Sequence, residues 1–200
     1  MTDSIIIPIE RHPFEPFLPP HTRLLMMGSF PPQQKRWSMN FFYPNFINDM
    51  WRIFGIIFKD DKDFFVDVKQ KTFKLNELVP FLTELGCGCY DTATEVRRLQ
   101  DNASDKFLEV VTPTDLPALL HRLPELQAIC TTGQKATDTF VENFCGKQPT
   151  VGDYSTFQFE GRSLRLYRMP SSSRAYPMRL DKKAAIYRRM FEELGMCPTH

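Results

Sequence analysis

The sequence predicts an α/β fold, a three-layer α/β/α sandwich around a central, mainly parallel four-stranded sheet. Short apolar runs bounded by Gly or Pro predict the strands, and segments with helical apolar spacing stand between them. The length of 200 residues suits one domain with a sizeable core. We expect a single domain over 1–200, in which 1–22 is an N-terminal extension and 59–74 a surface insertion.

Four segments carry the predicted strands. Residues 23–30 form a compact apolar run that ends at Gly and Pro, as a buried parallel strand does. Residues 87–92 and 126–133 predict the second and third strands. The segment 156–170 predicts a hairpin that leads into the last strand.

Helical segments separate these strands. Residues 48–58 have apolar side chains at helical spacing, with Asn48 or Asp49 as the N-cap. We expect further helices over 75–86, 134–144 and 181–195, and a kinked helix or a pair of helices over 114–126. The charged, irregular residues 59–74 predict the surface insertion, and a long polar connection containing 102–111 follows the second strand.

Composition limits the partners and the location. With a formal net charge of +1, nucleic acid or an anionic membrane would have to be held by a local patch. No stretch approaches the roughly 18 consecutive apolar residues of a membrane span. The N-terminus lacks a basic leader with a cleavage site. We therefore expect a cytoplasmic protein with no membrane partner, and we infer no obligate protein partner.

The cysteines do not have the spacing of a metal site. They are odd in number and lack paired C-x-x-C motifs: Cys87, Cys89, Cys130, Cys145 and Cys197. Cys87 and Cys89 stand two apart on a predicted strand, where small buried thiols fit better than a metal clamp. We expect no metal, no disulfide and no cofactor.

Three loops follow predicted strands and are rich in Gly, Pro or Ser. Their sequences are GSFPPQQKRW (28–37), TTGQKA (131–136) and RMPSSSRAYP (168–177). Ligands of open α/β sheets bind at the carboxyl ends of the strands, so these loops predict one shared cleft. Two consecutive prolines in the first loop argue against the Gly-rich phosphate loop of a nucleotide-binding enzyme.

The order of these motifs resembles a known family. A strand followed by GSFPP, a loop containing FFYPNFINDMW, the segment CGCYD, a strand followed by TTGQKA and a strand followed by MPSSS occur in turn from about residue 23 to residue 194. This order is similar to that of the uracil-DNA glycosylase superfamily, and most similar to the branch that includes the hypoxanthine-DNA glycosylases. The resemblance implies a monofunctional DNA glycosylase that hydrolyses the N-glycosidic bond of a deaminated base, hypoxanthine or uracil, in DNA for base excision repair.

An extruded base needs an aromatic surface on which to stack. The resemblance implies that Phe41 is this ring in the substrate-binding site. Ordinary core packing is the favoured alternative for the nearby rings Phe42 and Trp51. Backbone N–H groups that face the base or its sugar are then expected from Gly28, Ser29 and Phe30.

Amide side chains suit a selective, uncharged pocket because they donate and accept at a base edge and orient a water. Asn48 stands three residues before Trp51, where the related branch has a functional Asn, so the resemblance implies that Asn48 is catalytic. Capping of the following helix explains Asn48 equally well and does not exclude catalysis. Asn45 is the second amide candidate in the substrate-binding site.

Two positions depart from the pattern of the superfamily. Phe30 stands where many members have an Asp or Asn that activates the attacking water, and a phenyl ring cannot accept a proton. Met169 stands where many members have a donor to the leaving base. Catalysis would then rest on Asn48, backbone dipoles and stabilisation of the leaving base. The alternative is a catalytically inactive nucleic-acid or lesion-binding protein of the same fold.

The serines after the last strand suit DNA binding. Hydroxyl and main-chain N–H groups there can hold phosphates, although the same residues also make a turn: Ser171, Ser172 and Ser173. Arg174 or Tyr176 would fill the space left by the extruded base. Residues 147–189 contain ten Lys or Arg against three Asp or Glu. The solvated face of the last helix is an equal explanation for Lys182, Lys183, Arg188 and Arg189.

The remaining ionisable groups are less informative. Asp91 at the end of the second strand matches an aspartate of related proteins, but capping of a turn explains it equally well. The histidines fall outside the candidate loops, and we identify none as a catalytic base: His12, His21, His121 and His200.

Overall fold

The computed structural model describes residues 6–101, 104–144 and 146–197. Its central sheet has five strands in the order β5-β2-β8-β10-β9. Their bounds are Leu24–Gly28 for β2, Cys87–Asp91 for β5, Ala128–Thr132 for β8, Asp153–Phe159 for β9 and Arg162–Met169 for β10. The four predicted strands are confirmed as β2, β5, β8 and β10, and they are parallel. The first arm of the predicted hairpin adds β9 as an antiparallel edge strand, so the sheet has five strands instead of four.

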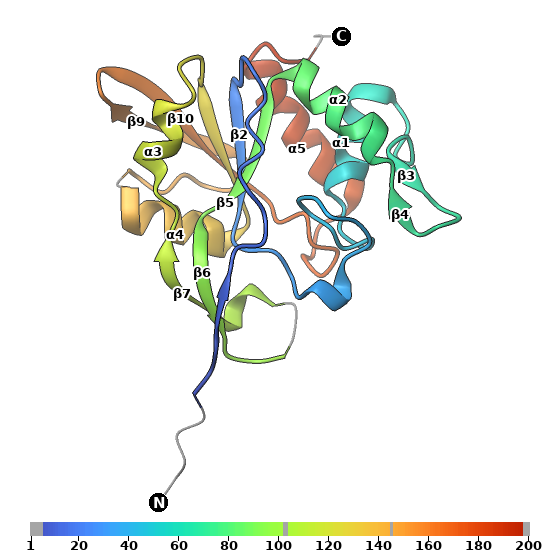
Figure 1. The fold of residues 1–200 in the computed structure, drawn as a ribbon. Helices are drawn as coiled ribbons and strands as arrows, with labels where there is room; N and C mark the ends of the chain where they lie inside the picture. The colour runs from blue at the N-terminus through green and yellow to red at the C-terminus, as the bar shows by residue number, and fades with distance from the viewer. Residues whose placement is uncertain (1–5, 102–103, 145, 198–200) are drawn as a thin grey trace, which may run out of the picture.

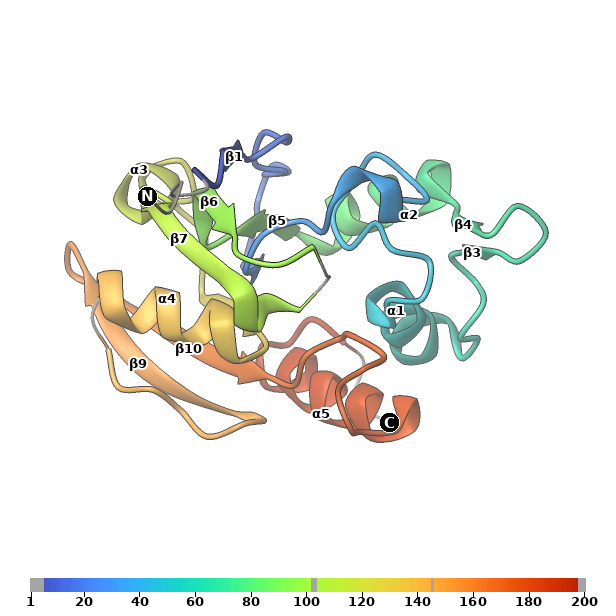
Figure 2. The same cartoon turned by 90° about the horizontal axis from the view of Figure 1, so that it is seen from below.

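Helices cover both faces of this sheet (Figures 1 and 2). One face carries α1, α2 and α5, whose bounds are Met50–Lys59, Leu75–Leu85 and Leu180–Glu193. The other face carries α3 and α4, with bounds Leu116–His121 and Gln134–Phe144. The predicted three-layer sandwich is therefore confirmed. Within the described residues, none of the helices combines the length and the apolarity that crossing a lipid bilayer requires.

Continuous burial explains why the central strands read as apolar runs. Every residue of β2, β5 and β8 is buried, because helices pack on both faces of a parallel sheet. The helix α2 ends at Gly86, whose φ of 72° is a left-handed conformation that glycine adopts without a steric penalty. The next strand begins at once, so the sharp turn at Gly86 sets the start of β5.

A second sheet stands where a polar connection was predicted. It consists of β1 (Ile9–Arg11), β6 (Ala93–Arg98) and β7 (Leu108–Pro113) in the order β1-β6-β7. In β6 only Ala93 and Val96 are buried, and register shifts interrupt the pairing on both sides of Glu95. Apolar alternation is therefore too weak to mark β6 in the sequence.

Two segments predicted to lie at the periphery also contribute to the core. The N-terminal extension supplies β1 and the ring of Phe17. The backbone N–H of Phe17 donates to Cys89 O at 3.0 Å. In the insertion, β3 (Val66–Asp67) pairs with β4 (Thr72–Phe73). The ring of Phe65, next to β3, is fully buried and lies 5.2 Å from the ring of Phe81. The insertion therefore covers core residues, although its charged residues suggested a surface loop.

Candidate functional site at the strand ends

The carboxyl ends of the parallel strands lie at one edge of the sheet. Gly28 at the end of β2 pairs in register with Asp91 at the end of β5. A Cβ atom on Gly28 would lie 2.6 Å from Asp91 Oδ1 and 3.7 Å from the hydroxyl oxygen of Tyr43. Glycine is therefore required at residue 28, because any side chain would displace the carboxylate of Asp91. This close approach brings the first loop, the end of β5 and the aromatic loop together.

Tyr43 joins the aromatic loop to the end of β8. Its hydroxyl group lies 3.0 Å from Thr132 Oγ1, within hydrogen-bond distance. Burial raises the pKa of Tyr43 well above its usual range, and the negative charge of Asp91 raises it further. The phenol is therefore neutral at physiological pH. The φ of Tyr43 is 52°, an unfavourable left-handed conformation that the surrounding contacts hold in place.

A histidine that sequence reasoning discounted pairs with Asp91. His12 Nε2 lies 2.8 Å from Asp91 Oδ2, and the two side chains are 3% and 9% exposed. His12 Nδ1 lies 3.1 Å from the N–H of Phe14 and 3.0 Å from its carbonyl oxygen. If Nδ1 accepts from that N–H, Nε2 carries the proton and donates to Asp91. The N-terminal segment thus contributes a polar group to the strand-end site.

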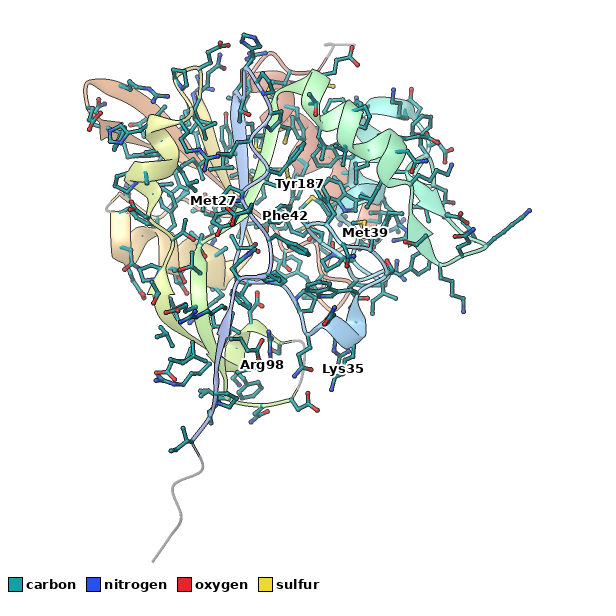
Figure 3. The ribbon with its side chains drawn as sticks, in the orientation of Figure 1. Met27, Lys35, Met39, Phe42, Arg98 and Tyr187 are labelled. Carbon is teal, nitrogen blue, oxygen red and sulfur yellow. The ribbon has the colours of Figure 1, made fainter. Side chains whose placement is uncertain are left out.

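Aromatic rings surround this buried pair. The centroid of His12 lies 4.8 Å from that of Tyr90 and 5.3 Å from that of Phe30. Phe42, labelled in Figure 3, is 4% exposed and lies 6.2 Å from His12. The rings exclude water from the imidazole and strengthen its interaction with the carboxylate.

Phe41 lies in a different aromatic cluster. Its centroid is 5.3 Å from that of Phe17 and 6.0 Å from that of Trp51, which is fully buried. Phe41 is partly buried and packs against the main core. The ring that the resemblance assigns to base stacking therefore contacts other rings of the protein.

Both candidate amides form local turns. The side-chain oxygen of Asn48 accepts the N–H of Met50 at 2.9 Å, and that of Asn45 accepts the N–H of Ile47 at 3.2 Å. Asn48 therefore supports the first turn of α1, as its alternative explanation predicts. Neither of these two bonds uses the side-chain N–H donors of Asn45 or Asn48. A catalytic Asn48 would act through these donors.

The ring of Phe30 is directed into the second sheet. It is 9% exposed and belongs to an apolar cluster with Ala93, Val96 and Leu108. Ser29 beside it is 8% exposed. The side chain of Phe30 therefore serves as a packing anchor.

The serine loop is attached to the aromatic loop. The N–H of Asp49 donates to Ser172 O at 2.9 Å. The side-chain oxygens of Ser171 and Ser173 accept the N–H groups two residues on, at 3.2 and 3.3 Å. Arg174 Nη2 lies 3.3 Å from Asp49 Oδ1, with half of the arginine side chain exposed. The loop is thus a turn held by hydrogen bonds, in which Ser173 and Arg174 are exposed to solvent.

A buried ion pair secures this turn. Lys183 is fully buried, and its Nζ lies 3.1 Å from Asp49 Oδ2 and 2.8 Å from Ser173 O. The explanation of Lys183 as part of a solvated helix face is therefore wrong. Other basic side chains of residues 147–189 also donate to carbonyl groups: Arg162 to Leu123 O at 2.8 Å and Arg188 to Ile56 O at 3.3 Å. Several of the basic side chains in this region therefore bind carbonyl or carboxylate groups of the protein itself.

Two hollows are lined by residues other than those of these contacts. One of about 190 Å³ is lined by residues 18–22 and 122–125, and one of about 340 Å³ lies against Gln34 and residues 37–40. Neither is lined by Pro170 or Asn48. Neither hollow therefore corresponds to the cleft expected where the loops meet.

The sulfur and metal chemistry is limited. Burial raises the pKa of Cys87, Cys89 and Cys130 above the usual range of a thiol. In the part of the chain that the structure describes, no group of three His, Cys, Asp or Glu side chains is placed to hold a metal ion. Cys145 and His200 lie outside the described residues.

Comparison with known proteins supports the fold. Neither the models of protein families nor the curated proteins contain a match to this chain. Among solved structures, a protein from Methanosarcina acetivorans described as a "putative uracil DNA glycosylase" superposes with a TM-score of 0.61 at 20% sequence identity. The alignment covers 94% of this chain and 99% of that one. At this identity the likeness shows the fold alone, and the chain shares the α/β fold of that protein.

Proposed function

We propose that this protein is a DNA glycosylase that hydrolyses the N-glycosidic bond of a deaminated base, hypoxanthine or uracil, for base excision repair. The observation that carries the proposal is the meeting of four loops at the strand ends. Tyr43 contacts Thr132, Gly28 contacts Asp91, and the backbone of Asp49 binds Ser172. The motif order and the fold shared with a protein named for this activity support the same conclusion.

The strand-end groups suit recognition of an extruded base. A neutral tyrosine hydroxyl and a buried carboxylate offer a donor and acceptors to a base edge without water. Backbone N–H groups of Gly28, Ser29 and Phe30 lie at the end of β2, where a base or its sugar would approach. We assign base stacking to Phe41, with Asn45 beside the base.

The solvent-facing side of the serine loop suits the DNA backbone. Ser173 and Arg174 are exposed, and Ser171 lies beside Gly133 at the start of α4. Phosphates can be held by these hydroxyl groups, by the N–H groups of 171–173 and by the guanidinium group. The damaged strand would then cross the molecule between the serine loop and the aromatic loop. We propose that the protein is cytoplasmic, because this reaction does not need a membrane.

A catalytically inactive DNA- or lesion-binding protein is the second candidate function. Two observations favour it: Phe30 is committed to apolar packing, and the side-chain oxygen of Asn48 is bonded to Met50 N–H. Such a protein would bind a duplex with a deaminated base and leave its glycosidic bond intact.

The test is strand cleavage of a duplex that contains one deoxyinosine or deoxyuridine. A monofunctional glycosylase leaves an abasic site, so alkali should cut the strand only after incubation with the wild-type protein. Asn48→Ala should leave the duplex intact, whereas Asn40→Ala should cleave as the wild type does, because Asn40 is an exposed amide of the same loop. Tight binding of the duplex with no cleavage of any deaminated base would favour the second candidate.

A further inference from the structure

A hollow beside the aromatic loop has no part in the function proposed above. It has a volume of about 340 Å³ and is lined by Gln34 and residues 37–40. This volume falls within the roughly 300–1,000 Å³ of small-ligand sites. Gln34 begins a short 3-10 helix, η1 (Gln34–Arg36), which is the blue turn at the lower right of Figure 1. None of the residues assigned above to the base or to phosphate lines this hollow.

Hydrogen bonds hold the walls of the hollow in place. The backbone N–H of Ser38 donates to Pro44 O at 2.8 Å, and the Ser38 hydroxyl group donates to the same oxygen at 2.9 Å. Thr72 Oγ1 of β4 donates to Ser38 O at 2.6 Å. Met39, labelled in Figure 3, is 8% exposed and belongs to the main core. The hollow is therefore bounded by backbone that is tied to the aromatic loop and to the insertion.

Trp37 is the aromatic residue among those that line the hollow. Its indole N–H donates to Pro32 O at 2.6 Å, and its ring lies 4.9 Å from that of Phe14 with an angle of 34° between the two planes. Trp37 nevertheless stays partly exposed. An indole ring that is already fixed in place can stack on a planar ligand with little further loss of conformational freedom.

Phe14 links the hollow to the rings of the strand-end site. Its ring contacts Trp37 and lies 5.5 Å from the ring of Phe42. The same ring lies 6.0 Å from that of His12, which pairs with Asp91 at the end of β5. A nucleic-acid strand that places one nucleotide at the strand ends can therefore bring a neighbouring nucleotide to Trp37.

The charge beside the hollow suits an anionic ligand. Arg36 in the last turn of η1 is exposed, and no acidic side chain of the described residues forms an ion pair with it. Lys35 is paired with Asp101 at 2.8 Å, so these two charges offset each other. The remaining positive charge disfavours a cationic ligand on the indole ring and favours one that joins a planar ring to a phosphate.

We propose that Trp37 stacks on an unpaired base of single-stranded DNA, beside the nucleotide held at the strand ends, while Arg36 contacts the phosphate. The proposal rests on the DNA binding of the proposed function and adds that the bound strand is unpaired next to the damaged base. Every base has a π-face, so this contact holds the strand without reading its sequence. The exposed amide of Asn40 would exchange hydrogen bonds with water for hydrogen bonds with a base at little net gain, so the affinity comes from the ring.

Tryptophan fluorescence tests the stacking directly, because the sequence contains two tryptophans and Trp51 is fully buried. The probe is a single strand of about ten thymidines, a usual length for a single-strand site, and it should quench the emission of Trp37. An abasic strand of the same length carries the phosphates without the bases and should leave the emission unchanged, as should the thymidine strand paired in a duplex. Trp37→Phe retains only Trp51 and should lose the quenching. Equal quenching by the abasic strand or by Trp37→Phe would overturn the proposal.

Affinity for the thymidine strand, measured by fluorescence anisotropy with a labelled probe, gives a second test. Trp37→Leu should weaken binding by about 5- to 150-fold, as expected for the loss of one stacked base. Trp37→Phe keeps a ring and should weaken binding less. Asn40→Ala is the matched control from the same hollow and should bind as the wild type does. Wild-type affinity in Trp37→Leu would overturn the site at Trp37.

These results do not depend on catalysis, because the probes contain no deaminated base. Quenching of Trp37 in a wild-type protein that excises no deaminated base would contradict the proposed glycosylase and support the single-strand site. Excision by a wild-type protein whose emission the thymidine strand does not quench would support the glycosylase and contradict the single-strand site.

Discussion

His12 and Asp91 form a buried pair at the candidate site, with 2.8 Å between Nε2 and Oδ2. They are 79 positions apart in the sequence, and the pair joins the N-terminal segment to the end of β5. Thr114 Oγ1 also donates to Asp91 O at 2.6 Å. Asp91 is therefore held through both its side chain and its backbone oxygen. The loss of stability when such a contact is removed can be measured.

Removal of the imidazole should destabilise the protein because it leaves the carboxylate of Asp91 buried without this partner. We expect His12→Phe to lower the free energy of unfolding by about 1–3 kcal/mol, measured by urea denaturation. Combination with Asp91→Asn should cost less than the sum of the two single changes, since the pair is then removed together. Strictly additive effects would show that the two side chains do not interact.

Placing a carboxylate at residue 30 should harm the fold. The change Phe30→Asp removes a buried ring and places a charge in the apolar cluster with Val96 and Leu108. We expect a loss of at least about 3 kcal/mol in the free energy of unfolding, measured by thermal or urea unfolding. Phe30→Leu, which keeps an apolar side chain, should lose less than about 1.5 kcal/mol. A well-folded Phe30→Asp protein with faster base excision would contradict the anchoring role of the ring.

Substitutions of two adjacent lysines of α5 should change the free energy of unfolding by very different amounts. Lys183 is fully buried against Asp49, whereas Lys182 is exposed. Lys183→Met should cost about 3–5 kcal/mol of unfolding free energy, because it leaves a buried carboxylate with a weaker partner. Lys182→Met should change stability by less than about 0.5 kcal/mol. Equal effects of the two changes, measured by urea denaturation, would be inconsistent with the buried pair.

The two roles of Asn48 can be separated by a pair of substitutions. Asn48→Ala removes both the amide donors and the oxygen that accepts Met50 N–H, so it should lose about 1 kcal/mol of stability as well as activity. Asn48→Ser keeps an oxygen acceptor and should retain stability while still losing activity. Unfolding and base excision are measured on the same preparations. An active Asn48→Ser protein would leave only the structural role.

Arg174 should contact phosphate. Replacing it with Ala should weaken binding of a duplex whatever its sequence, and should reduce the slope of log affinity against log salt by about 1. Arg179→Ala is the control, because Arg179 is exposed nearby and paired with Asp181 at 3.1 Å. Fluorescence anisotropy at several salt concentrations measures both slopes. An unchanged slope for Arg174→Ala would remove this residue from the DNA interface.

The sequence predicts most of the central sheet because burial on both faces leaves a continuous apolar signal. The five residues of β2 are an example, all buried and all apolar or Gly. The strand β6 gives no such signal, since Ala93 and Val96 stand among charged residues and a register shift separates them. Local patterns identify strands that are enclosed and miss a strand that is half exposed and irregular.

The candidate site is less predictable because its groups meet only in the folded chain. The motif order predicts that the first loop and the serine loop follow strands at one edge of the sheet, and there Gly28 ends one of the parallel strands and Ser171 follows another. His12 lies in a segment without a strand-end motif, and long-range pairing of β1 with β6 brings it beside Asp91. Lys183 looks like a surface residue in any periodicity analysis, and its partner Asp49 is 134 residues away.

The most direct test of the central claim is detection of the free base released from DNA. A duplex with one deoxyinosine or deoxyuridine is incubated with the wild-type protein, and mass spectrometry measures free hypoxanthine or uracil. We predict one free base for each abasic site formed, with no strand break before alkali treatment. Tight binding of the duplex with no base released from either substrate would contradict the assignment of the strand-end site as a glycosylase centre.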